Sequence, residues 1–118
     1  MYVKKELGFF TARLKKVVKK YPLSTDYIDG IINSLKGKPT QGDIYPGFGE
    51  LSVRKMRIGL PEYKIGKRKG LRLLHLSIDE KKKVAPLTIY AKKDYGSEAK
   101  VKKEVIMALQ EALLELES

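Results

Sequence analysis

Two kinds of hydrophobic pattern alternate along the chain, and together they predict seven secondary-structure elements. Apolar residues at helical spacing predict three helices, over residues 9–20, 26–35 and 98–116. Short apolar runs rich in β-forming residues predict four strands, over residues 2–7, 51–58, 71–78 and 84–90. The order β-α-α-β-β-β-α predicts an α+β domain, in which two N-terminal helices and a C-terminal helix pack on a small antiparallel sheet.

Glycine, proline and charged residues mark the connections between these elements. Residues 37–49 contain four Gly and two Pro, a composition that predicts a loop. Residues 79–83 form a charged turn that suits an antiparallel hairpin, whereas residues 61–70 make a longer, basic connection. Pro86 lies inside the last predicted strand, so we expect an edge, a bulge or the start of the strand at that position.

The length and composition indicate a single domain that spans residues 1–118 and buries a real core, since 42% of the chain is hydrophobic. The absence of cysteine excludes disulfides and cysteine-ligated metals. No apolar run approaches the roughly 20 residues that a membrane span needs. Residues 1–7 lack the apolar core of a signal peptide. We therefore expect a soluble, cytoplasmic protein.

The charge of the chain changes this picture, because 25 Lys and Arg against 14 Asp and Glu leave a net charge of +11. A balance this basic in a small domain implies a polyanionic partner, with RNA or DNA as the first candidate and a ribosome included. An anionic membrane surface or an acidic protein would also satisfy the charge. The alternative without a partner is a merely soluble basic protein.

The cations are gathered beside and between the predicted strands of residues 51–90. They are Arg54, Lys55, Arg57, Lys64, Lys67, Arg68, Lys69, Arg72, Lys92 and Lys93. A small sheet with this pattern offers phosphate-binding groups on a rigid frame, which points to nucleic acid. Lys55 and Arg57 share one face of their strand, while Arg54 points the other way.

Three phrases of the sequence, in the order given by the predicted elements, resemble the RelE/ParE toxin superfamily, and within it the RelE/HigB-like branch. The first is Lys55-Met56-Arg57, followed by the basic connection of residues 61–70, which is called the basic loop below. The second is Gly70-Leu71-Arg72-Leu73-Leu74-His75. The third is Leu87-Thr88-Ile89-Tyr90-Ala91-Lys92-Lys93-Asp94. The resemblance covers most of residues 2–95, and it implies a RelE-like fold.

This resemblance implies a toxin of a type II toxin–antitoxin system that enters the ribosomal A site and inhibits translation by cleaving mRNA there. The implied reaction uses no metal and no cofactor, because the ribose 2′-hydroxyl attacks the adjacent phosphate and the 5′-oxygen leaves. The implied partners are mRNA, the ribosome with its ribosomal RNA, and a cognate antitoxin protein. The cleavage needs a base for the 2′-proton, cations that stabilise the phosphorane, and an acid for the leaving group.

The resemblance also implies roles for individual residues. The catalytic candidates are Arg57, Arg72, His75, Tyr90, Lys92 and Lys93. The candidates for RNA contacts are Arg54, Lys55, Lys64, Lys67, Arg68, Lys69 and Tyr95. Arg72 and Lys93 come first for phosphate stabilisation, and Arg57 comes next. In the family a tyrosine or another aromatic residue usually lies farther past the basic pair, but the matching residues 97–100 contain none.

Two of these roles stay open between chemistry and structure. His75 is the one side chain in this set whose unperturbed pKa lies near 7, which makes it the natural candidate base. It lies three residues after Arg72, so the two face opposite sides of a regular strand unless a bulge intervenes, and a buried structural role is the alternative. Tyr90 and Tyr95 are candidates for the acid or for stacking on a base, with a core role as the alternative for Tyr90.

Three functions therefore compete. The first is the ribosome-dependent mRNA endoribonuclease, and the second is a non-catalytic RNA- or DNA-binding module on the same fold. The third is a gyrase-inhibiting relative, which ranks last because that branch lacks the clustered basic residues. The first two differ in whether the residues Arg57, Arg72, His75, Tyr90 and Lys93 converge on one concave face.

Overall fold

The computed structural model of the protein describes residues 1–95 and 97–117, which form an α+β domain. Its helices in these residues are α1 (Gly8–Lys20), α2 (Thr25–Ser34) and α3 (Glu98–Glu117). Its strands are β1 (Val3–Lys4), β2 (Asp43–Ile44), β3 (Ser52–Ile58), β4 (Leu71–Ile78) and β5 (Lys83–Ala91). The three helices and the three long strands predicted from the hydrophobic pattern are thus confirmed. None of the helices in these residues is long and apolar enough to cross a membrane.

The strands form one open sheet in the order β1-β5-β4-β3-β2, and its pairing corrects the expected all-antiparallel arrangement. Neighbours from β2 to β5 are antiparallel, but β1 pairs with β5 in parallel. Parallel neighbours need a long crossover, and here that crossover includes α1 and α2 as well as the other strands. The sheet is therefore mixed.

Two boundaries also differ from the expectation. The strand predicted over residues 2–7 is reduced to β1, because α1 already begins at Gly8. The predicted loop contains the short strand β2, which pairs with β3 through Asp43 opposite Lys55. The loop can turn into this pairing because Gly42 adopts a positive φ of 91° close against the backbone of β3.

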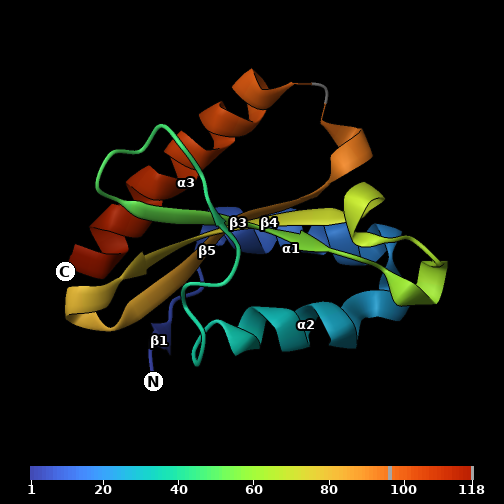
Figure 1. Cartoon of the computed structure of the whole chain (residues 1–118), viewed down its shortest axis with the longest axis horizontal. Coiled ribbons are helices and arrows are strands. Elements are labelled where there is room, and N and C mark those ends of the chain that lie inside the picture. Colours follow the sequence, from blue (N-terminus) through green and yellow to red (C-terminus); the bar gives the residue numbers. More distant parts are fainter. Residues whose placement is uncertain (96, 118) are drawn as a thin grey trace.

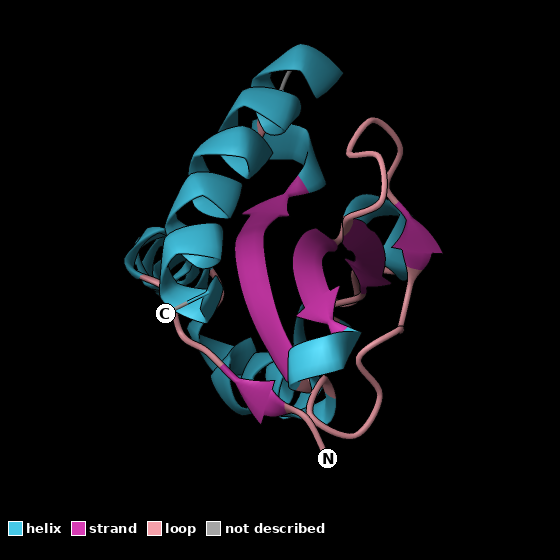
Figure 2. Ribbon diagram, turned by 90° about the vertical axis from the view of Figure 1, so that its left-hand side faces the viewer, coloured by secondary structure: helices cyan, strands magenta, loops and turns pink. Residues whose placement is uncertain are grey.

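The helices cover the sheet from more than one side. Figure 1 shows α3 above the strands and α2 below them, with α1 behind, and Figure 2 shows α3 lying beside the strands after a turn of 90°. Both α1 and α3 pack against β5. Both β4 and β5 are buried along almost their whole length, which agrees with their almost continuously apolar sequences.

A bulge interrupts the pairing of β4 with β5 next to Pro86. Leu74 lies opposite Thr88, but the next residue, His75, lies opposite Pro86, so Leu87 is an extra residue on β5. Proline has no N–H to donate to a sheet and is tolerated at such bulges. The bulge is one of the three arrangements expected at Pro86. Because β4 pairs with β3 without interruption from Leu71 to Ser77, the side chains of β4 itself still alternate regularly.

Candidate functional site

A concave region lies where β3, β4 and β5 approach the start of α3. This cavity of about 360 Å³, called the basic hollow below, is lined by Lys55, Arg57, Arg72, Tyr90, Lys92, Tyr95, Ser97, Glu98 and Val101. Six of these residues belong to the set expected from the sequence. They come from separate parts of the chain, so only the folded sheet brings them together.

The sheet register explains this convergence. Arg57 on β3 lies directly opposite Arg72 on β4, and Arg72 lies directly opposite Tyr90 on β5. Directly opposite residues point to the same face, and so do residues two apart along a strand, which adds Lys55. Lys92 reaches the hollow from the 3-10 turn Lys92–Asp94, which follows β5. Arg57 and Lys92 are exposed, so their charged groups are accessible to a ligand.

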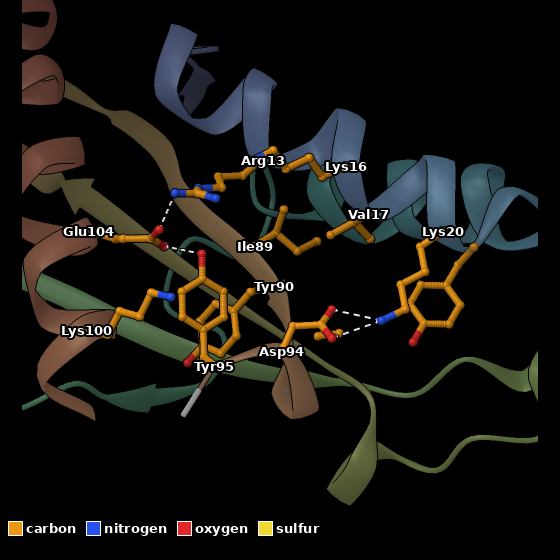
Figure 3. Close-up of a pocket in the computed structure, with 12 residues that line it drawn as sticks. Arg13, Lys16, Val17, Lys20, Ile89, Tyr90, Asp94, Tyr95, Lys100 and Glu104 are labelled. Atoms are coloured by element: carbon orange, nitrogen blue, oxygen red, sulfur yellow. Dashed lines mark hydrogen bonds and ion pairs between the residues drawn. The ribbon is translucent and has the colours of Figure 1, made fainter. Parts of the chain in front are cut away.

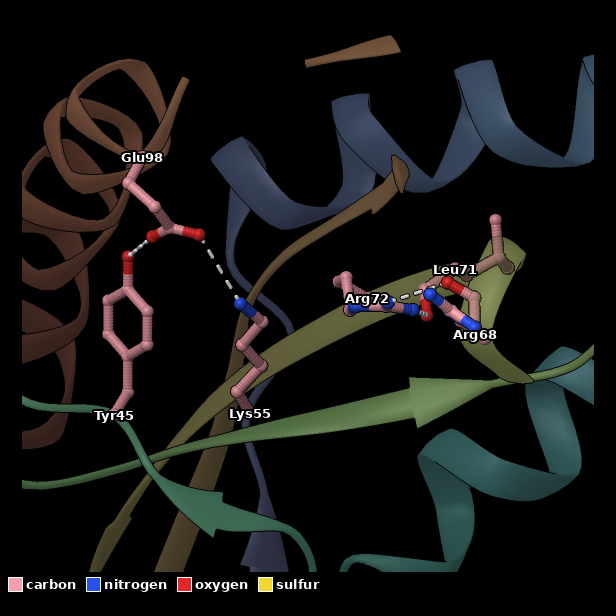
Figure 4. A network of polar contacts seen from close by, with 6 residues as sticks. All are labelled: Tyr45, Lys55, Arg68, Leu71, Arg72 and Glu98. Atoms are coloured by element: carbon pink, nitrogen blue, oxygen red, sulfur yellow. Dashed lines mark hydrogen bonds and ion pairs between the residues drawn. The ribbon is translucent and has the colours of Figure 1, made fainter. Parts of the chain in front are cut away.

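Arg72 is almost completely buried, with 3% of its surface exposed. Its Nη1 donates to the carbonyl oxygens of Lys67 at 2.9 Å and Leu71 at 3.1 Å, and its Nη2 donates to that of Arg68 at 2.9 Å. Figure 4 shows the contacts of Arg72 with Leu71 and Arg68 at the start of β4. They compensate for the desolvation of the guanidinium, and they hold the basic loop against the sheet.

The two guanidinium groups of Arg57 and Arg72 repel each other across the strands. The pKa of Arg72 is lowered, first by burial and then by the charge of Arg57. Like charges directly opposite each other destabilise a sheet. An anion bound between these side chains would relieve the repulsion, so the pair has the electrostatics of an anion site.

The basic loop presents its own cations at the rim of this region. Lys67, Arg68 and Lys69 form a short 3-10 turn in which each side chain is exposed, while two of their carbonyls point back to Arg72. Lys64 is also exposed and adopts a left-handed backbone conformation with φ 54°. None of these four residues lines the basic hollow itself, so they suit the expected role of peripheral contacts to a polyanion.

A carboxylate also faces the basic hollow. Glu98 accepts a hydrogen bond from the Tyr45 hydroxyl at 2.9 Å, and its other oxygen lies 3.5 Å from the Lys55 ammonium (Figure 4). The pKa of Glu98 is lowered, first by the hydrogen bond from Tyr45 and further by the charges of Lys55 and Lys102. Glu98 therefore stays ionised at neutral pH beside the cations.

Glu98 and Tyr45 are site residues that the sequence did not indicate. Glu98 at the start of a helix is already explained by the helix dipole and by its spacing from Lys102, and Tyr45 looked like an anchor of the loop. A second cavity of about 400 Å³ is lined by Tyr45 and Lys102 and shares Lys55, Arg57 and Glu98 with the basic hollow. The concave surface therefore extends toward β2.

The two tyrosines of the basic hollow form one aromatic pair. The rings of Tyr90 and Tyr95 meet edge to face with centroids 4.6 Å apart. The Tyr95 hydroxyl donates to Glu104 at 2.6 Å, and Glu104 also pairs with Arg13 (Figure 3). Burial raises the pKa of Tyr90 to about 12, and burial together with the hydrogen bond to Glu104 raises that of Tyr95. Both phenols therefore keep their protons at neutral pH.

His75 lies outside this site, so of the two roles left open for it the structure favours the buried structural one. It is fully buried, and its Nε2 lies 2.8 Å from the carbonyl oxygen of Gln41. A carbonyl only accepts, so Nε2 carries the proton, while Nδ1 has no partner among the described residues. Burial lowers the pKa of His75, which keeps the ring neutral. The physical reason is the regular alternation of β4, which turns His75 away from the face of Arg72.

Arg54 and Lys93 also lie away from the basic hollow. Arg54 points to the other face of β3, opposite His75, and donates to the carbonyl oxygen of Gly42 at 3.1 Å. Lys93 is exposed in the 3-10 turn Lys92–Asp94, but it does not line the basic hollow, whereas its neighbour Lys92 does. The expected joint contact of Arg72 and Lys93 with one phosphate is therefore replaced by a cluster of Lys55, Arg57, Arg72 and Lys92.

Comparisons with known proteins add no family to this description. A scan against models of protein families gave no match. A search of curated proteins gave no match either. Across residues 1–95 and 97–117, no three His, Asp or Glu side chains are grouped so that they could hold a metal ion. The function is therefore argued from the geometry and charge of the basic hollow.

Proposed function

We propose that the protein is an endoribonuclease toxin, similar to the RelE/ParE superfamily, that cleaves mRNA in the ribosome and so inhibits translation. The observation that carries this proposal is the convergence of four cations and two tyrosines, from three strands and the segment after them, on the basic hollow. The net charge of +11 and the exposed cations of the basic loop support a large RNA partner.

The proposed reaction needs no group beyond the RNA and the side chains of the hollow. The ribose 2′-oxygen bonds to the neighbouring phosphorus, and the bond from phosphorus to the 5′-oxygen breaks, which leaves a 2′,3′-cyclic phosphate and a 5′-hydroxyl. The phosphorane carries more negative charge than the starting phosphate. Preorganised cations aimed at that developing charge supply the largest catalytic effect, and Arg57, Lys55 and Lys92 are placed for this role.

The proton acceptor and the proton donor are also assigned to residues that line the basic hollow. Glu98 is an ionised carboxylate that lines the hollow, so it is the group we assign to accept the 2′-proton. The leaving 5′-oxygen receives a proton from a cationic or phenolic donor, for which Lys92 and Tyr90 both line the hollow. The buried position of His75 argues against a role for its ring in either transfer.

The non-catalytic RNA-binding module stays as a second candidate, because two specific observations favour it. His75 and Lys93, both expected at the chemistry, lie outside the basic hollow. The raised pKa of Tyr90, about 12, also makes its phenol a weak acid. The same cations would then hold phosphate without cleaving the chain.

The test is induced expression in a bacterial host, with growth measured and mRNA 5′-ends mapped. The variant Arg57→Ala/Lys92→Ala removes two exposed cations of the hollow and is expected to abolish both growth arrest and new 5′-ends inside codons. The matched control Lys93→Ala removes a neighbouring cation outside the hollow and is expected to act like the wild type. Equal cleavage by all three proteins would overturn the proposed site.

A third variant separates the two candidate functions. Glu98→Gln removes the proton acceptor and one negative charge, so the proposed nuclease loses cleavage by about 100-fold or more while ribosome binding is retained or strengthened. Wild-type protein that binds programmed ribosomes without cutting their mRNA would replace the nuclease by the binding module.

A further inference from the structure

A third cavity lies behind the tyrosine pair of the basic hollow. It has a volume of about 250 Å³ and lies between α1, the end of β5 and the start of α3 (Figure 3). Val17, Ile89 and Ala91 contribute apolar surface to it, and Tyr90 and Tyr95 contribute aromatic surface. We call it the α1 cavity. It belongs to none of the roles assigned above.

The two cavities share a wall. Tyr90 and Tyr95 line both the basic hollow and the α1 cavity, and their rings touch edge to face. A ligand that extends over this pair therefore reaches a cationic site on one side and an aromatic, largely apolar site on the other. A nucleotide has these two characters, since its phosphate is anionic and its base is a flat aromatic ring.

The charges around the α1 cavity suit an uncharged aromatic base that belongs to a polyanion. Its two carboxylates are neutralised, because Glu104 pairs with Arg13, and Asp94 pairs with Lys20 at 2.9 Å. Two further cations line the cavity, namely the exposed Lys16 and Lys100, whose ammonium lies 5.3 Å from the centroid of the Tyr95 ring. The cavity therefore carries a net positive charge at its opening, beside apolar walls.

The position of Tyr95 is fixed by groups outside the hollow. Glu104 is 7% exposed and binds the Tyr95 hydroxyl with one oxygen and Arg13 on α1 with the other. This bridge joins α1 to α3 and sets the orientation of the ring in advance. Stacking on a ring that is already ordered avoids the entropy cost of immobilising it on binding.

We propose that the α1 cavity receives the unstacked base of one nucleotide of the mRNA whose phosphate lies in the basic hollow, and this inference rests on the proposed function. Single-stranded RNA is recognised in this manner, with bases splayed out and stacked on aromatic side chains. The ligand class is thus a nucleobase, and the site would contribute to the choice of the codon position that is cut.

The experiment measures binding of the full chain to ribosomes programmed with an mRNA whose A-site codon carries 2′-O-methyl riboses, which block the attack and leave binding alone. In three further mRNAs, one of the three codon nucleotides is abasic. Omission of one particular base is expected to weaken binding by the wild type by about tenfold, as for the loss of a stacked base. Equal binding of all four mRNAs would overturn the base site.

Variants of α1 link that base to this cavity. Val17→Phe fills the cavity without touching the basic hollow. This variant should bind the intact mRNA as weakly as the wild type binds the sensitive abasic mRNA. Omission of that base should then weaken binding by the variant no further. Ala12→Phe adds the same ring at an exposed position of α1 and is the matched control, expected to bind like the wild type. A base dependence that persists undiminished in folded Val17→Phe, checked by circular dichroism, would also overturn the proposal.

The proposed function and the base site fail in different ways. If wild-type protein neither binds programmed ribosomes nor cleaves unmodified mRNA, the proposed function is wrong and the base site is overturned with it. If the wild type cleaves unmodified mRNA but ignores base omission, only the base site is overturned. The comparison of abasic mRNAs uses wild-type protein, so it stands even where Val17→Phe fails to fold.

Discussion

Arg72 and His75 lie three residues apart on β4, and both use a buried basic side chain to hold a loop. Arg72 donates to carbonyl oxygens of the basic loop, whereas His75 binds the carbonyl oxygen of Gln41 on the other face of the sheet. Arg72 remains at the wall of the basic hollow beside Arg57, but His75 is sealed from solvent. Similar local chemistry thus ends in two different environments.

The difference shows where a buried charge is retained and where it is given up. The guanidinium of Arg72 stays protonated even when burial lowers its pKa, and its carbonyl partners stabilise the charge. The imidazole of His75 has one partner and escapes the cost of burial by staying neutral. Charged Arg72 faces the site proposed for phosphate, and neutral His75 holds the loop that contains Gln41 against the sheet.

The largest expected effect comes from replacing Arg72, the charged residue of this pair. Arg72→Met removes the guanidinium donor from three carbonyl oxygens and so releases the basic loop. We expect mRNA cleavage to fall by about 100-fold or more and the free energy of unfolding to fall by about 2–4 kcal/mol. Ribosome-dependent cleavage and urea unfolding measure the two effects. Arg68→Ala, which keeps its carbonyl, is the control, and an Arg72→Met protein as active as this control would remove Arg72 from the site.

The next effect tests how closely the basic loop must lie against the sheet. A Cβ on Gly70 would come within 2.1 Å of the Ile58 carbonyl oxygen, so Gly70→Ala must push the loop away from β3. We expect the free energy of unfolding to fall by about 3 kcal/mol, with reduced cleavage. Gly37→Ala, where a Cβ meets nothing within 4 Å, is the control in the same urea titration. Equal unfolding midpoints for the two variants would contradict the close packing.

Replacement of His75, the neutral residue of this pair, should lower the stability of the fold and leave mRNA cleavage nearly unchanged. His75→Leu removes the ring donor from the partly buried Gln41 carbonyl oxygen, which should lower the free energy of unfolding by about 1–2 kcal/mol. Cleavage by the folded protein, measured well below its melting temperature, should stay within about twofold of the wild type. A loss as large as that of Arg72→Met would return His75 to the proposed catalytic groups.

The smallest expected effect is the pH dependence of stability. The pKa of His75 is lower in the folded protein than its ordinary value of 6.5. Below pH 6.5 the unfolded chain therefore takes up a proton that the folded chain refuses, so stability declines from that pH down to the folded pKa. The slope for one proton cannot exceed about 1.4 kcal/mol per pH unit.

Comparison with a variant isolates this contribution to the pH dependence. His75→Gln keeps a donor for Gln41 and does not titrate, so the difference between its unfolding free energy and that of the wild type should change over this acidic range and be constant above pH 6.5. Urea titrations at several pH values provide the measurement. Parallel curves for the two proteins would mean that the ring is not held neutral.

Much of the fold could be predicted from local patterns. The helices α1, α2 and α3 and the strands β3, β4 and β5 follow hydrophobic periodicity, which the sequence displays directly. The parallel pairing of β1 with β5 and the pairing of β2 with β3 could not be predicted, because two-residue strands carry no periodicity. Pro86 marked an irregularity, but only the pairing showed that Leu87 is the extra residue.

The candidate site, too, could be predicted from the sequence only in part. Alternation along a strand was enough to place Lys55 and Arg57 on one face and to separate Arg72 from His75. Whether Lys92 or Lys93 enters the hollow depends on the turn after β5, which the sequence leaves open. Glu98 joins the site because α3 returns across the sheet, and no spacing in the sequence relates it to Lys55 or Tyr45.

The sequence by itself determined that the domain is α+β, that it is strongly basic, and that its cations lie beside and between the strands, since charge and periodicity are local properties of the chain. The tertiary structure decided which of these cations meet, that His75 is neutral and sealed, and that Tyr90 and Tyr95 separate two cavities. Those features depend on sheet register and on the path of α3, which are set by contacts between residues far apart in the chain.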